Sequence, residues 1–519
     1  MKTPTTTSEQ QITAERLAIV IKSCRKIMRK DKGLSGDLDR LPLLTWIMFL
    51  KFLDDMEQIE ESRAKVRREE YRPTIDPPYR WKDWAADETG MTGPELISFV
   101  SQEEAVRPDG TKGPGMLAYL RSLQDGRRGR KQVVATVFSG QTLRIQSGYL
   151  LRDVINQINA IHFESRDELF TLGHLYESML REMRDAAGDS GEFYTPRPVV
   201  RFMVEALDPR LGETVLDPAC GTGGFLVEAH SYIAKQVNTV EDRKVLQTST
   251  IFGGEAKPLP YLLAQMNLLL HGLEAPQIDP ENSLRFPLNE IGESDRVDLV
   301  LTNPPFGGEE ERGILNNFPE DKQTTETALL FLQLIMRKLK RGEKPGRAAV
   351  VVPNGTLFGD GICARIKEQL LTDFNLHTII RLPEGVFAPY TDIATNLLFF
   401  DRSGKTNAIW YFQVPTPDGR RKYTKTNPLQ ADELTEALEW FRSAPRCKGQ
   451  NAWKVPVDEV LKNGCNLDIK NPRSQESMKH RPPEELVESI MQNTQRVAKL
   501  MSEIQSMLAS PSDADKESS

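Results

Sequence analysis

The sequence predicts an α/β protein in which a helical amino-terminal domain precedes a doubly wound, Rossmann-like sheet. Two patterns carry this prediction. Apolar residues recur at helical spacing up to about residue 183, whereas after residue 190 short apolar runs alternate with helix-length segments. Buried parallel strands joined by helical crossovers produce the second pattern. The chain of 519 residues also exceeds what one hydrophobic core usually organises, so we expect several domains.

Helices are expected over residues 13–69, near Leu117 and from Leu150 to Met183. We place a helical domain at residues 1–160, and the last of these helices continues beyond it. Two apolar stripes at helical spacing support the first of these: Leu17, Ile21, Cys24 and Met28, then Trp46, Phe49, Leu50 and Leu53. The stretch from Pro73 to Trp84 is expected to be an ordered loop. Residues 125–131, DGRRGRK, are expected to form a basic turn, which is either solvated or in contact with a phosphate.

Six short apolar runs are expected to be strands: Thr214–Asp217, Thr250–Gly253, Val297–Thr302, Ala348–Pro353, Thr378–Leu382 and Asn396–Phe400. Helix-length segments at 224–237 and 327–340 fit crossovers between them. We place the α/β domain at residues 161–405, closed by the last of these strands, and a carboxy-terminal extension at 406–480.

The last region, residues 481–519, is expected to hold one long helix at 482–508 and a disordered tail. The helix opens with Pro482 and Pro483, which suit a first helical turn. Its apolar residues alternate at four- and three-residue spacing, as in a coiled-coil seam, with Asn493 in the one polar seam position: Leu486, Ile490, Val497, Leu500, Ile504 and Met507. Such a stripe needs a partner helix to cover it.

Composition excludes several classes of protein. A formal charge of −7 argues against a protein that coats nucleic acid through bulk charge, although a local basic groove remains compatible with it. The five cysteines form no C-x-x-C pair and the six histidines share no ligand spacing, so we expect neither disulfides nor a metal site. No signal peptide or membrane-spanning run is apparent, and we expect a cytoplasmic protein.

A glycine loop follows the first predicted strand, in Val215–Phe225, VLDPACGTGGF. Glycines let a backbone approach a ligand at the carboxyl edge of such a sheet. The spacing differs from dinucleotide-binding and P-loop motifs, and an acid, Asp217, ends the strand. A loop with an acid and no cationic helper suits a cofactor that has a positive centre and no phosphate, such as S-adenosylmethionine. A purely structural strand-to-helix turn would also explain the glycines.

Glu255 ends the next predicted strand, in TIFGGE, where a carboxylate can accept hydrogen bonds from both hydroxyls of a ribose. A surface acid at a strand end is the alternative. Ahead of the sheet, the segment EFYTPRP at 192–198 is expected to be extended because two of its residues precede proline, so it can lie along a ligand. By itself it would be only a helix entry.

The run Asn303-Pro304-Pro305-Phe306 follows the strand VDLVLT and carries the strongest functional signal. An amino group on an aromatic ring is a poor nucleophile because its lone pair is delocalised. Two acceptors aimed at its N–H bonds draw the nitrogen toward tetrahedral geometry, and the Asn303 side-chain oxygen and the Pro304 carbonyl can supply them. Phe306 offers a face on which an extruded base could stack. A tight Pro-Pro turn beside a core phenylalanine is the alternative.

In this order, these motifs resemble the amino-group DNA methyltransferases and, more narrowly, the modification (M) subunit of type I restriction–modification systems. The resemblance covers nearly the whole chain: a helical front, EFYTPRPVV, DPACGTGGF, FGGE, NPPF, VVPNGTLF and LPEGVFAPYTDIATNLLFF. It implies methyl transfer from S-adenosylmethionine to N6 of a flipped adenine in DNA.

The resemblance also implies roles for individual residues. Asn303, Pro304, Pro305 and Phe306 match the catalytic motif. The positions that match cofactor contacts are Glu192, Phe193, Tyr194, Thr195, Pro196, Arg197, Asp217, Gly221, Thr222, Gly223, Gly224 and Glu255. A position that is often Asp in the family, contacting the adenine of the cofactor, is Asn282 here, and its amide can still hydrogen-bond that edge.

The implied partners are double-stranded DNA, a specificity (S) subunit, a second copy of this chain and a restriction (R) subunit. Two other functions use similar residues: methylation of a glutamine side chain or of RNA guanine, and a non-catalytic assembly subunit. The helical front and the carboxy-terminal seam argue against the first, and the intact motifs at 303–306 and 221–224 argue against the second. The polar segment at 309–325 is either a solvated loop or one that orders over DNA.

Overall fold

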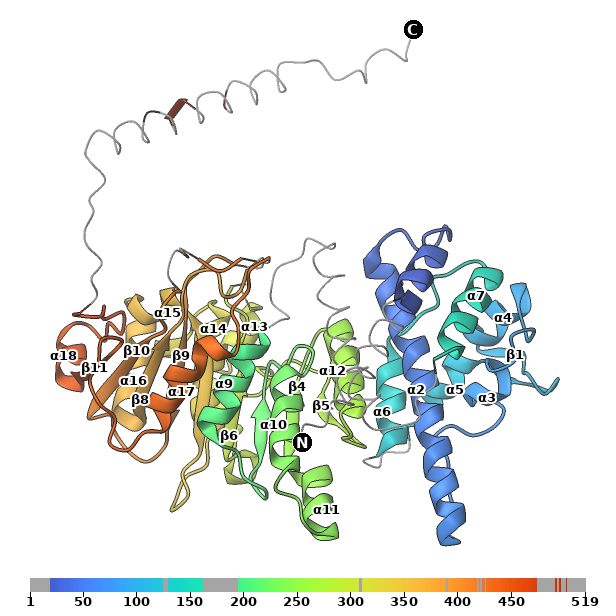
Figure 1. Cartoon of the computed structure of the whole chain (residues 1–519), viewed down its shortest axis with the longest axis horizontal. Coiled ribbons are helices and arrows are strands. Elements are labelled where there is room, and N and C mark those ends of the chain that lie inside the picture. The colour runs from blue at the N-terminus through green and yellow to red at the C-terminus, as the bar shows by residue number, and fades with distance from the viewer. Residues whose placement is uncertain are drawn as a thin grey trace, which may run out of the picture. The chain divides into compact units, whose positions relative to one another are not determined.

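The computed structural model describes residues 19–124, 129–161, 195–307, 310–388, 391–417, 420, 422–424, 426–473, 491, 494, 495 and 501 (Figure 1). The chain divides into two compact units, Met1–Ile469 and Lys470–Ser519, and every element named below lies in the first. Apart from four single positions, the helix expected at 482–508 lies outside the described residues, as do Glu192, Phe193 and Tyr194. Those expectations stay predictions.

The amino-terminal part is helical, as predicted. After a helix at residues 19–28 come α2 (Asp37–Arg67), α3 (Trp81–Trp84), α4 (Gly93–Ser101), α5 (Met116–Ser122), α6 (Arg130–Ser139) and α7 (Gly148–Asn159). All described residues of the two predicted stripes are buried. The helices α3 and α4 and an antiparallel hairpin of β1 (Glu104–Val106) and β2 (Lys112–Pro114) were not predicted. Within the described residues no helix is long and apolar enough to cross a membrane.

In the part of the chain that the structure describes, nine strands form one sheet in the order β11-β10-β8-β9-β7-β6-β3-β4-β5. Their bounds are β3 (Val215–Asp217), β4 (Ile251–Gly254), β5 (Gln277–Asp279), β6 (Leu299–Thr302), β7 (Arg347–Pro353), β8 (Asn375–Arg381), β9 (Thr395–Asp401), β10 (Ala408–Gln413) and β11 (Ala452–Pro456). All six predicted runs coincide with strands. The short, polar β5 escaped prediction because its three residues carry no apolar periodicity.

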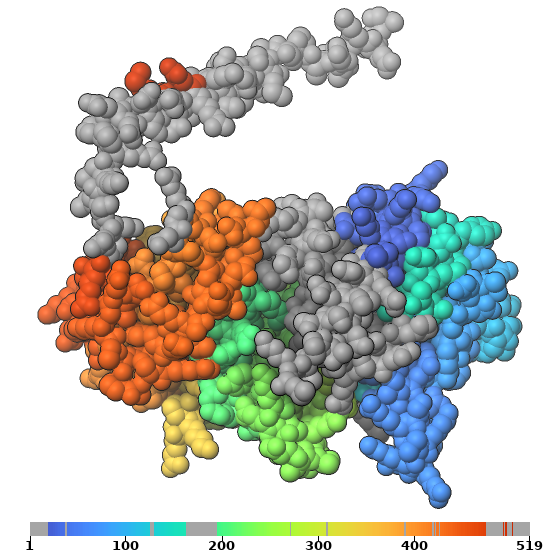
Figure 2. Space-filling view, in the orientation of Figure 1, coloured from blue at the N-terminus to red at the C-terminus, as the bar shows by residue number. Residues whose placement is uncertain are grey.

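The sheet continues beyond β9, so the expectation that residues 396–400 close it was wrong. The strand β9 runs antiparallel between β7 and β8, which leaves the other edge of β8 open. That edge is covered by β10, which pairs in parallel with β8, and β11 then pairs antiparallel with β10. Pairing of this kind removes an exposed strand edge. Figure 2 shows the orange and red atoms of this end of the sheet and of the helices that follow it gathered side by side on this face.

Helices cover both faces of the sheet, as in a doubly wound fold. In β7, Ala349 and Val351 belong to the core shared with α9 (Arg197–Leu207) and α10 (Gly224–Ala234). The alternate residues of the strand pack in a second core with α14 (Thr327–Lys338) and α16 (Ile362–Asp373). The remaining helices are α11 (Val240–Ser249), α12 (Pro258–Leu270), α13 (Arg312–Leu315), α15 (Asn354–Phe358), α17 (Thr435–Arg442) and α18 (Val457–Lys462).

The amino-terminal helices contact the α/β part through α6 and α12. Arg130, the first residue of α6, donates from both terminal nitrogens to the Glu60 carboxylate of α2 at 2.7 Å, and its Nη2 lies 3.8 Å from Oε2 of Glu274. Its guanidinium is therefore neutralised inside the protein. For Arg130, in the basic turn at 125–131, the phosphate-contact interpretation is not supported.

Candidate active site

The carboxyl ends of β3 and β6 meet where the strand order reverses. From β3 the chain adds β4 and β5 on one side, and then returns to add β6 and β7 on the other, with β3 and β6 paired in parallel. Open α/β sheets bind ligands at such a switch point. Asp217 ends β3 and Asn303 follows β6 directly, so the fold brings the glycine loop and the NPPF run to the same place.

The glycine loop turns from β3 into α10 in backbone conformations that favour glycine. Gly221 has φ 54° and Gly223, the N-cap of α10, has φ 77°. The N–H of Gly223 donates to the Cys220 carbonyl at 2.7 Å, which closes the turn. A Cβ placed on Gly224 would meet no described atom within 4 Å, so the backbone at the start of α10 is open to close approach.

Asn267 supports this loop, and the sequence analysis missed it. Its Nδ2 donates to the Thr222 carbonyl at 2.9 Å from the buried face of α12. An asparagine within a largely apolar helical run was the signal that could have revealed it, because a buried amide needs polar partners.

Glu255 lies against the glycine loop at the end of β4. Its Oε2 accepts the Gly221 N–H at 3.0 Å and its Oε1 accepts the Lys257 N–H at 2.8 Å. Ser283 joins the same corner, since its hydroxyl donates to the Pro218 carbonyl at 2.7 Å and lies 2.3 Å from where a Cβ of Gly254 would be. The end of β4, the glycine loop and the segment at 281–284 therefore pack together.

Asn303 is held by the segment that precedes α9. Its Nδ2 donates to Thr195 Oγ1 at 3.0 Å, a contact between residues 108 positions apart. Its Oδ1 is buried, and no described residue donates a hydrogen bond to that oxygen. A buried acceptor without a donor is costly, so it marks a place where a ligand N–H fits.

The remaining residues of the NPPF run lie close by. Pro304 is buried, and Phe306 is half-buried with its ring edge-to-face against Phe387, at 5.8 Å between centroids and 67° between planes. Phe387 follows β8 and was not predicted as a site residue. It supports one side of the Phe306 ring, and the part that stays exposed is a surface on which a base could stack.

Asp217 lies beneath the loop rather than at its surface. The residue is 1% exposed and its Oδ1 accepts the Ala219 N–H at 3.2 Å. Burial raises the pKa of this carboxyl to about 7, with a smaller contribution in the same direction from Glu255. Asp217 therefore supports the loop from below, and a direct contact with a ligand stays a prediction.

Arg197 is the first residue of α9, and its Nη1 lies 3.4 Å from the carbonyl oxygen of Gly224, to which it donates. Burial lowers the pKa of the guanidinium to about 10, an effect that Glu228 opposes. Arg197 is still a cation at neutral pH. It lies at the amino end of α10, where it can meet a carboxylate.

Asn282 is placed beside the loop through its neighbour Ser283. Its Oδ1 accepts the Leu284 N–H at 2.9 Å and its Nδ2 donates to Glu310 Oε2 at 3.2 Å. Glu310 belongs to the polar segment at 309–325. The described part of that segment contains α13 and buries Phe318, so it is packed against the protein rather than simply solvated.

These residues fit S-adenosylmethionine. The glycine loop permits close approach, Glu255 offers a carboxylate beside the loop that can accept from ribose hydroxyls, and Arg197 offers a cation for the carboxylate of an amino acid. The buried Oδ1 of Asn303 is an acceptor that has no donor among the described residues and can therefore bind a ligand N–H. All of them lie at the carboxyl edge of β3, β4 and β6, where a methyl donor and an amine would have to meet.

Comparison with known proteins agrees with this site. Residues 167–481 match the family described as N-6 DNA Methylase, and residues 17–158 match the HsdM N-terminal domain. The type I restriction enzyme EcoEI methylase subunit of Escherichia coli is 43% identical over 501 residues, which is 95% of this chain and 97% of that protein. The StySJI methylase subunit of Salmonella typhimurium is 32% identical over 64% of this chain and 66% of its own length.

Two solved structures are also similar over most of their length. A modification subunit assigned to a type I restriction enzyme from Vibrio vulnificus YJ016 has a TM-score of 0.85 at 66% identity, covering 90% of this chain and 99% of that one. A chain from a structural study of complex assembly in the type I R-M system has a TM-score of 0.74 at 40% identity, covering 95% and 98%.

The fold and these matches define an S-adenosylmethionine-dependent DNA methyltransferase that acts on adenine N6. Within that class, the chain belongs to the methylase (modification) subunits of type I restriction–modification systems. The comparisons thus favour the DNA enzyme over a glutamine or RNA-guanine methyltransferase and over a non-catalytic assembly subunit.

Proposed function

We propose that methyl transfer takes place at the carboxyl edge of β3 and β6, with Asn303 and Pro304 holding the target amino group. The observation that carries this proposal is the buried Asn303 Oδ1, which no described residue satisfies, while Thr195 holds the Nδ2 of the same amide. The two N–H bonds of adenine N6 match two acceptors, the Asn303 Oδ1 and the Pro304 carbonyl oxygen.

The chemistry follows from those two hydrogen bonds. Accepting both N–H bonds draws the N6 nitrogen out of conjugation, so its lone pair becomes available, and this stabilisation is strongest in the transition state. S-adenosylmethionine supplies the methyl group. An adenine must leave the duplex to reach a site in the NPPF turn. The half-buried ring of Phe306 then offers this adenine a stacking face, which replaces the adjacent bases of the DNA.

For the cofactor we propose a role for each described residue at the loop. Gly221, Thr222, Gly223 and Gly224 give close backbone approach, Glu255 accepts from the ribose hydroxyls and Arg197 meets the carboxylate of the methionine part. Thr195 and Pro196 position Asn303 and lead into α9. Asp217 supports the loop, Asn282 meets the adenine, and the family resemblance adds Glu192, Phe193 and Tyr194.

A two-stage assay tests this function. The purified chain should bind labelled S-adenosylmethionine by itself, and should transfer the methyl group to adenine N6 in DNA when a specificity subunit is present. Labelled cofactor bound with no methylated adenine in the complete complex would contradict catalysis. Methylation of glutamine or of RNA in place of DNA would move the chain to another substrate class.

We further propose that sequence recognition comes from a separate specificity subunit, within a complex that also holds a second copy of this chain and a restriction subunit. Type I R-M systems are named in the related structures. Base-specific readout needs several side chains presented to base edges in a groove, and the residues after β9 are used to extend the sheet. The reaction is expected in the cytoplasm, with the chromosomal DNA.

The apolar seam predicted at 486–507 is our candidate for the contact with that subunit. Deleting the chain from Pro482 onward should leave cofactor affinity unchanged and weaken assembly with the specificity subunit, together with site-specific methylation. Unchanged assembly would reject the seam as the contact. The division into regions at 1–160, 161–405, 406–480 and 481–519 stays a proposal that limited proteolysis can check.

A further inference from the structure

The segment at 281–284 presents a hydrogen-bond donor, the side-chain amide of Asn282. Recognition of an adenine ring requires a hydrogen-bond acceptor as well. The orientation of the Asn282 amide is set by its partners: the Leu284 N–H can only donate, so the atom facing it at 2.9 Å is the oxygen. The nitrogen therefore points the other way, toward the Glu310 carboxylate at 3.2 Å. The oxygen of Asn282 is already used within its own turn, so its side chain offers N–H groups outward.

Adenine has a mixed edge, with the exocyclic N6 amino group as a donor beside the ring nitrogen N1 as an acceptor. Asn282 Nδ2 carries two hydrogens, of which one goes to Glu310 and the other is suited to a ring nitrogen. The N6 amino group needs an adjacent acceptor. The Glu310 carboxylate, in contact with the Asn282 amide, is the described group that has this chemistry in the right place.

Glu310 is held there by packed structure. Its N–H donates to the Thr325 carbonyl at 3.4 Å, which closes the base of the segment. Within it, Asn317 donates from Nδ2 to the Leu284 carbonyl at 2.8 Å, and accepts the Leu288 N–H at its own carbonyl at 2.9 Å. A small apolar core that includes Leu284 and the buried Phe318 joins the same two segments. Glu310 and Asn282 thus belong to one packed unit.

That unit lies against the glycine loop. The Ser283 hydroxyl donates to the Pro218 carbonyl, and Ser283 packs so closely on Gly254 that no side chain fits there. Glu255, proposed for the ribose, follows Gly254 directly. The segment at 281–284, where Asn282 and Glu310 meet, therefore packs beside the residue proposed for the ribose.

We propose that Glu310 is a cofactor-binding residue, which accepts a hydrogen bond from the exocyclic amino group of the adenine of S-adenosylmethionine while Asn282 donates to the neighbouring ring nitrogen. In this arrangement the carboxylate and the amide together replace the single acid that is frequent at the position of Asn282. The inference rests on the proposed cofactor site at the glycine loop. It gives the segment after the NPPF run a direct role in cofactor recognition.

The test compares two ligands by calorimetry: S-adenosylhomocysteine and its inosine analogue, in which a 6-oxo group replaces the amino group and N1 carries a proton. The wild-type chain should bind the adenine form at least about tenfold more tightly, because the analogue reverses both hydrogen bonds. Glu310→Ala should lower affinity for the adenine form about tenfold and reduce the preference to within about threefold. Glu311→Ala is the matched control, since it removes the same charge from the adjacent, exposed residue and should leave both affinities unchanged.

The double variant Asn282→Asp with Glu310→Gln gives a second readout that a merely structural contact would not move. It reverses the polarity of the pair, so it should prefer the inosine analogue. Full preference for adenine in Glu310→Ala, with a melting temperature equal to that of the wild type, would overturn the proposal. If Gly223→Asp failed to weaken either ligand, the proposed cofactor site itself would be wrong, whichever result Glu310→Ala gave.

Discussion

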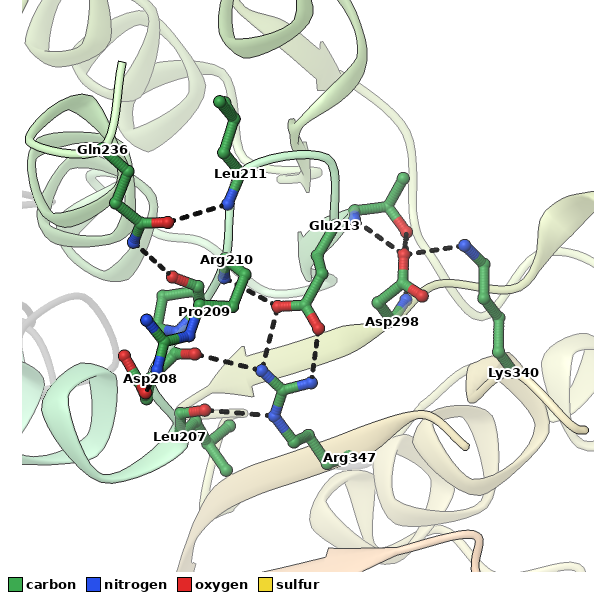
Figure 3. A network of polar contacts seen from close by, with 11 residues as sticks. Leu207, Asp208, Pro209, Arg210, Leu211, Glu213, Gln236, Asp298, Lys340 and Arg347 are labelled. Atoms are coloured by element: carbon green, nitrogen blue, oxygen red, sulfur yellow. Dashed lines mark hydrogen bonds and ion pairs between the residues drawn. The ribbon is translucent and has the colours of Figure 1, made fainter. Parts of the chain in front are cut away.

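The two edges of the central sheet differ in how their polar groups are satisfied. At the amino ends of β3, β6 and β7, charged side chains pair with one another and with backbone groups in a closed network (Figure 3). At the carboxyl ends of β3 and β6, a buried acceptor on Asn303 has no donor among the described residues, and the buried Asp217 has no cation beside it. We therefore assign stability to the amino edge of the sheet and propose function at its carboxyl edge.

The amino-edge network joins the end of α9 with the amino ends of β3, β6 and β7. Arg347, the first residue of β7, pairs with both oxygens of Glu213 at 2.8 and 2.9 Å and donates to the carbonyls of Leu207 and Asp208 at the end of α9. Asp298, just before β6, accepts from the backbone and hydroxyl of Thr214 at 2.8 Å and from Lys340 at 2.7 Å. Bidentate pairs of this kind add geometric specificity as well as energy.

This difference between the two edges indicates how a ligand-binding edge can be recognised in a structure that contains no ligand. Native proteins satisfy nearly all of their buried polar groups, so an unsatisfied one at a sheet edge needs a reason. Here the unsatisfied Asn303 Oδ1 lies beside the loop glycines and in the turn that holds Pro304. The rule that buried polar groups are hydrogen-bonded is broken at sites where a ligand supplies the missing partner.

The largest expected effect is at the functional edge. Asn303→Ala removes the acceptor that we propose for the target amine, so methyl transfer in the complete complex should fall by about 10² to 10³-fold or more, while cofactor affinity stays within a few-fold. Single-turnover methylation and calorimetry measure the two quantities. Asn238→Ala, an exposed asparagine just after α10, serves as the control and should change neither. Turnover of Asn303→Ala near the wild-type rate would remove Asn303 from the mechanism.

At the opposite edge the effect should appear in stability and not in chemistry. Arg347→Ala breaks the pair with Glu213 and leaves carbonyls of α9 without a donor, so the free energy of unfolding should fall by about 2 kcal/mol. Cofactor affinity at a temperature where the variant is folded should not change.

Denaturant titration measures the loss in Arg347→Ala. Arg341→Ala is the matched control, because Arg341 is half-exposed and its Nε lies 3.9 Å from Glu293, so it should cost less than about 0.5 kcal/mol. Equal stability of the two variants would show that the network of Figure 3 does not stabilise this edge.

Two glycines with positive φ allow the edges to be compared directly. Gly223 in the loop has φ 77° and Gly212, between α9 and β3, has φ 90°, with no described atom near its missing Cβ. Aspartate should strain both backbones by a similar amount of about 1–2 kcal/mol. Gly223→Asp should also weaken cofactor binding by about tenfold or more, which calorimetry measures. A similar loss in Gly212→Asp would mean that backbone strain alone accounts for it.

The last expected effect is a pH dependence from Asp217. Its pKa is raised from 3.8 to about 7 by burial, so the native protein holds this proton more tightly than the unfolded chain does. The stabilising contribution is complete below about pH 4 and is lost as the pH rises through 7. Asp217→Asn should remove this slope, so the wild type should lose melting temperature relative to the variant between pH 5 and 8. Parallel pH profiles would contradict the assignment.

Much of the fold could be predicted from local pattern. The runs that became β3, β4, β6, β7, β8 and β9 are apolar because both faces of the sheet are covered, and that requirement is visible residue by residue. The hairpin of β1 and β2 and the strand β5 escaped prediction because three residues carry too little periodicity. The strands β10 and β11 were missed because an open edge on β8 becomes visible only when β9 is seen to insert beside it.

The chemistry of the site was set by the sequence: an acceptor followed by two prolines after one strand, and a glycine loop after another, permit only a few reactions. Only the tertiary structure decided which residues meet. The contact of Thr195 with Asn303, the support of Thr222 by Asn267 and the pairing of Asn282 with Glu310 join residues far apart in the chain. Periodicity reports whether a residue is buried, whereas a hydrogen bond between distant residues depends on how strands are ordered and helices packed. No local pattern records that order.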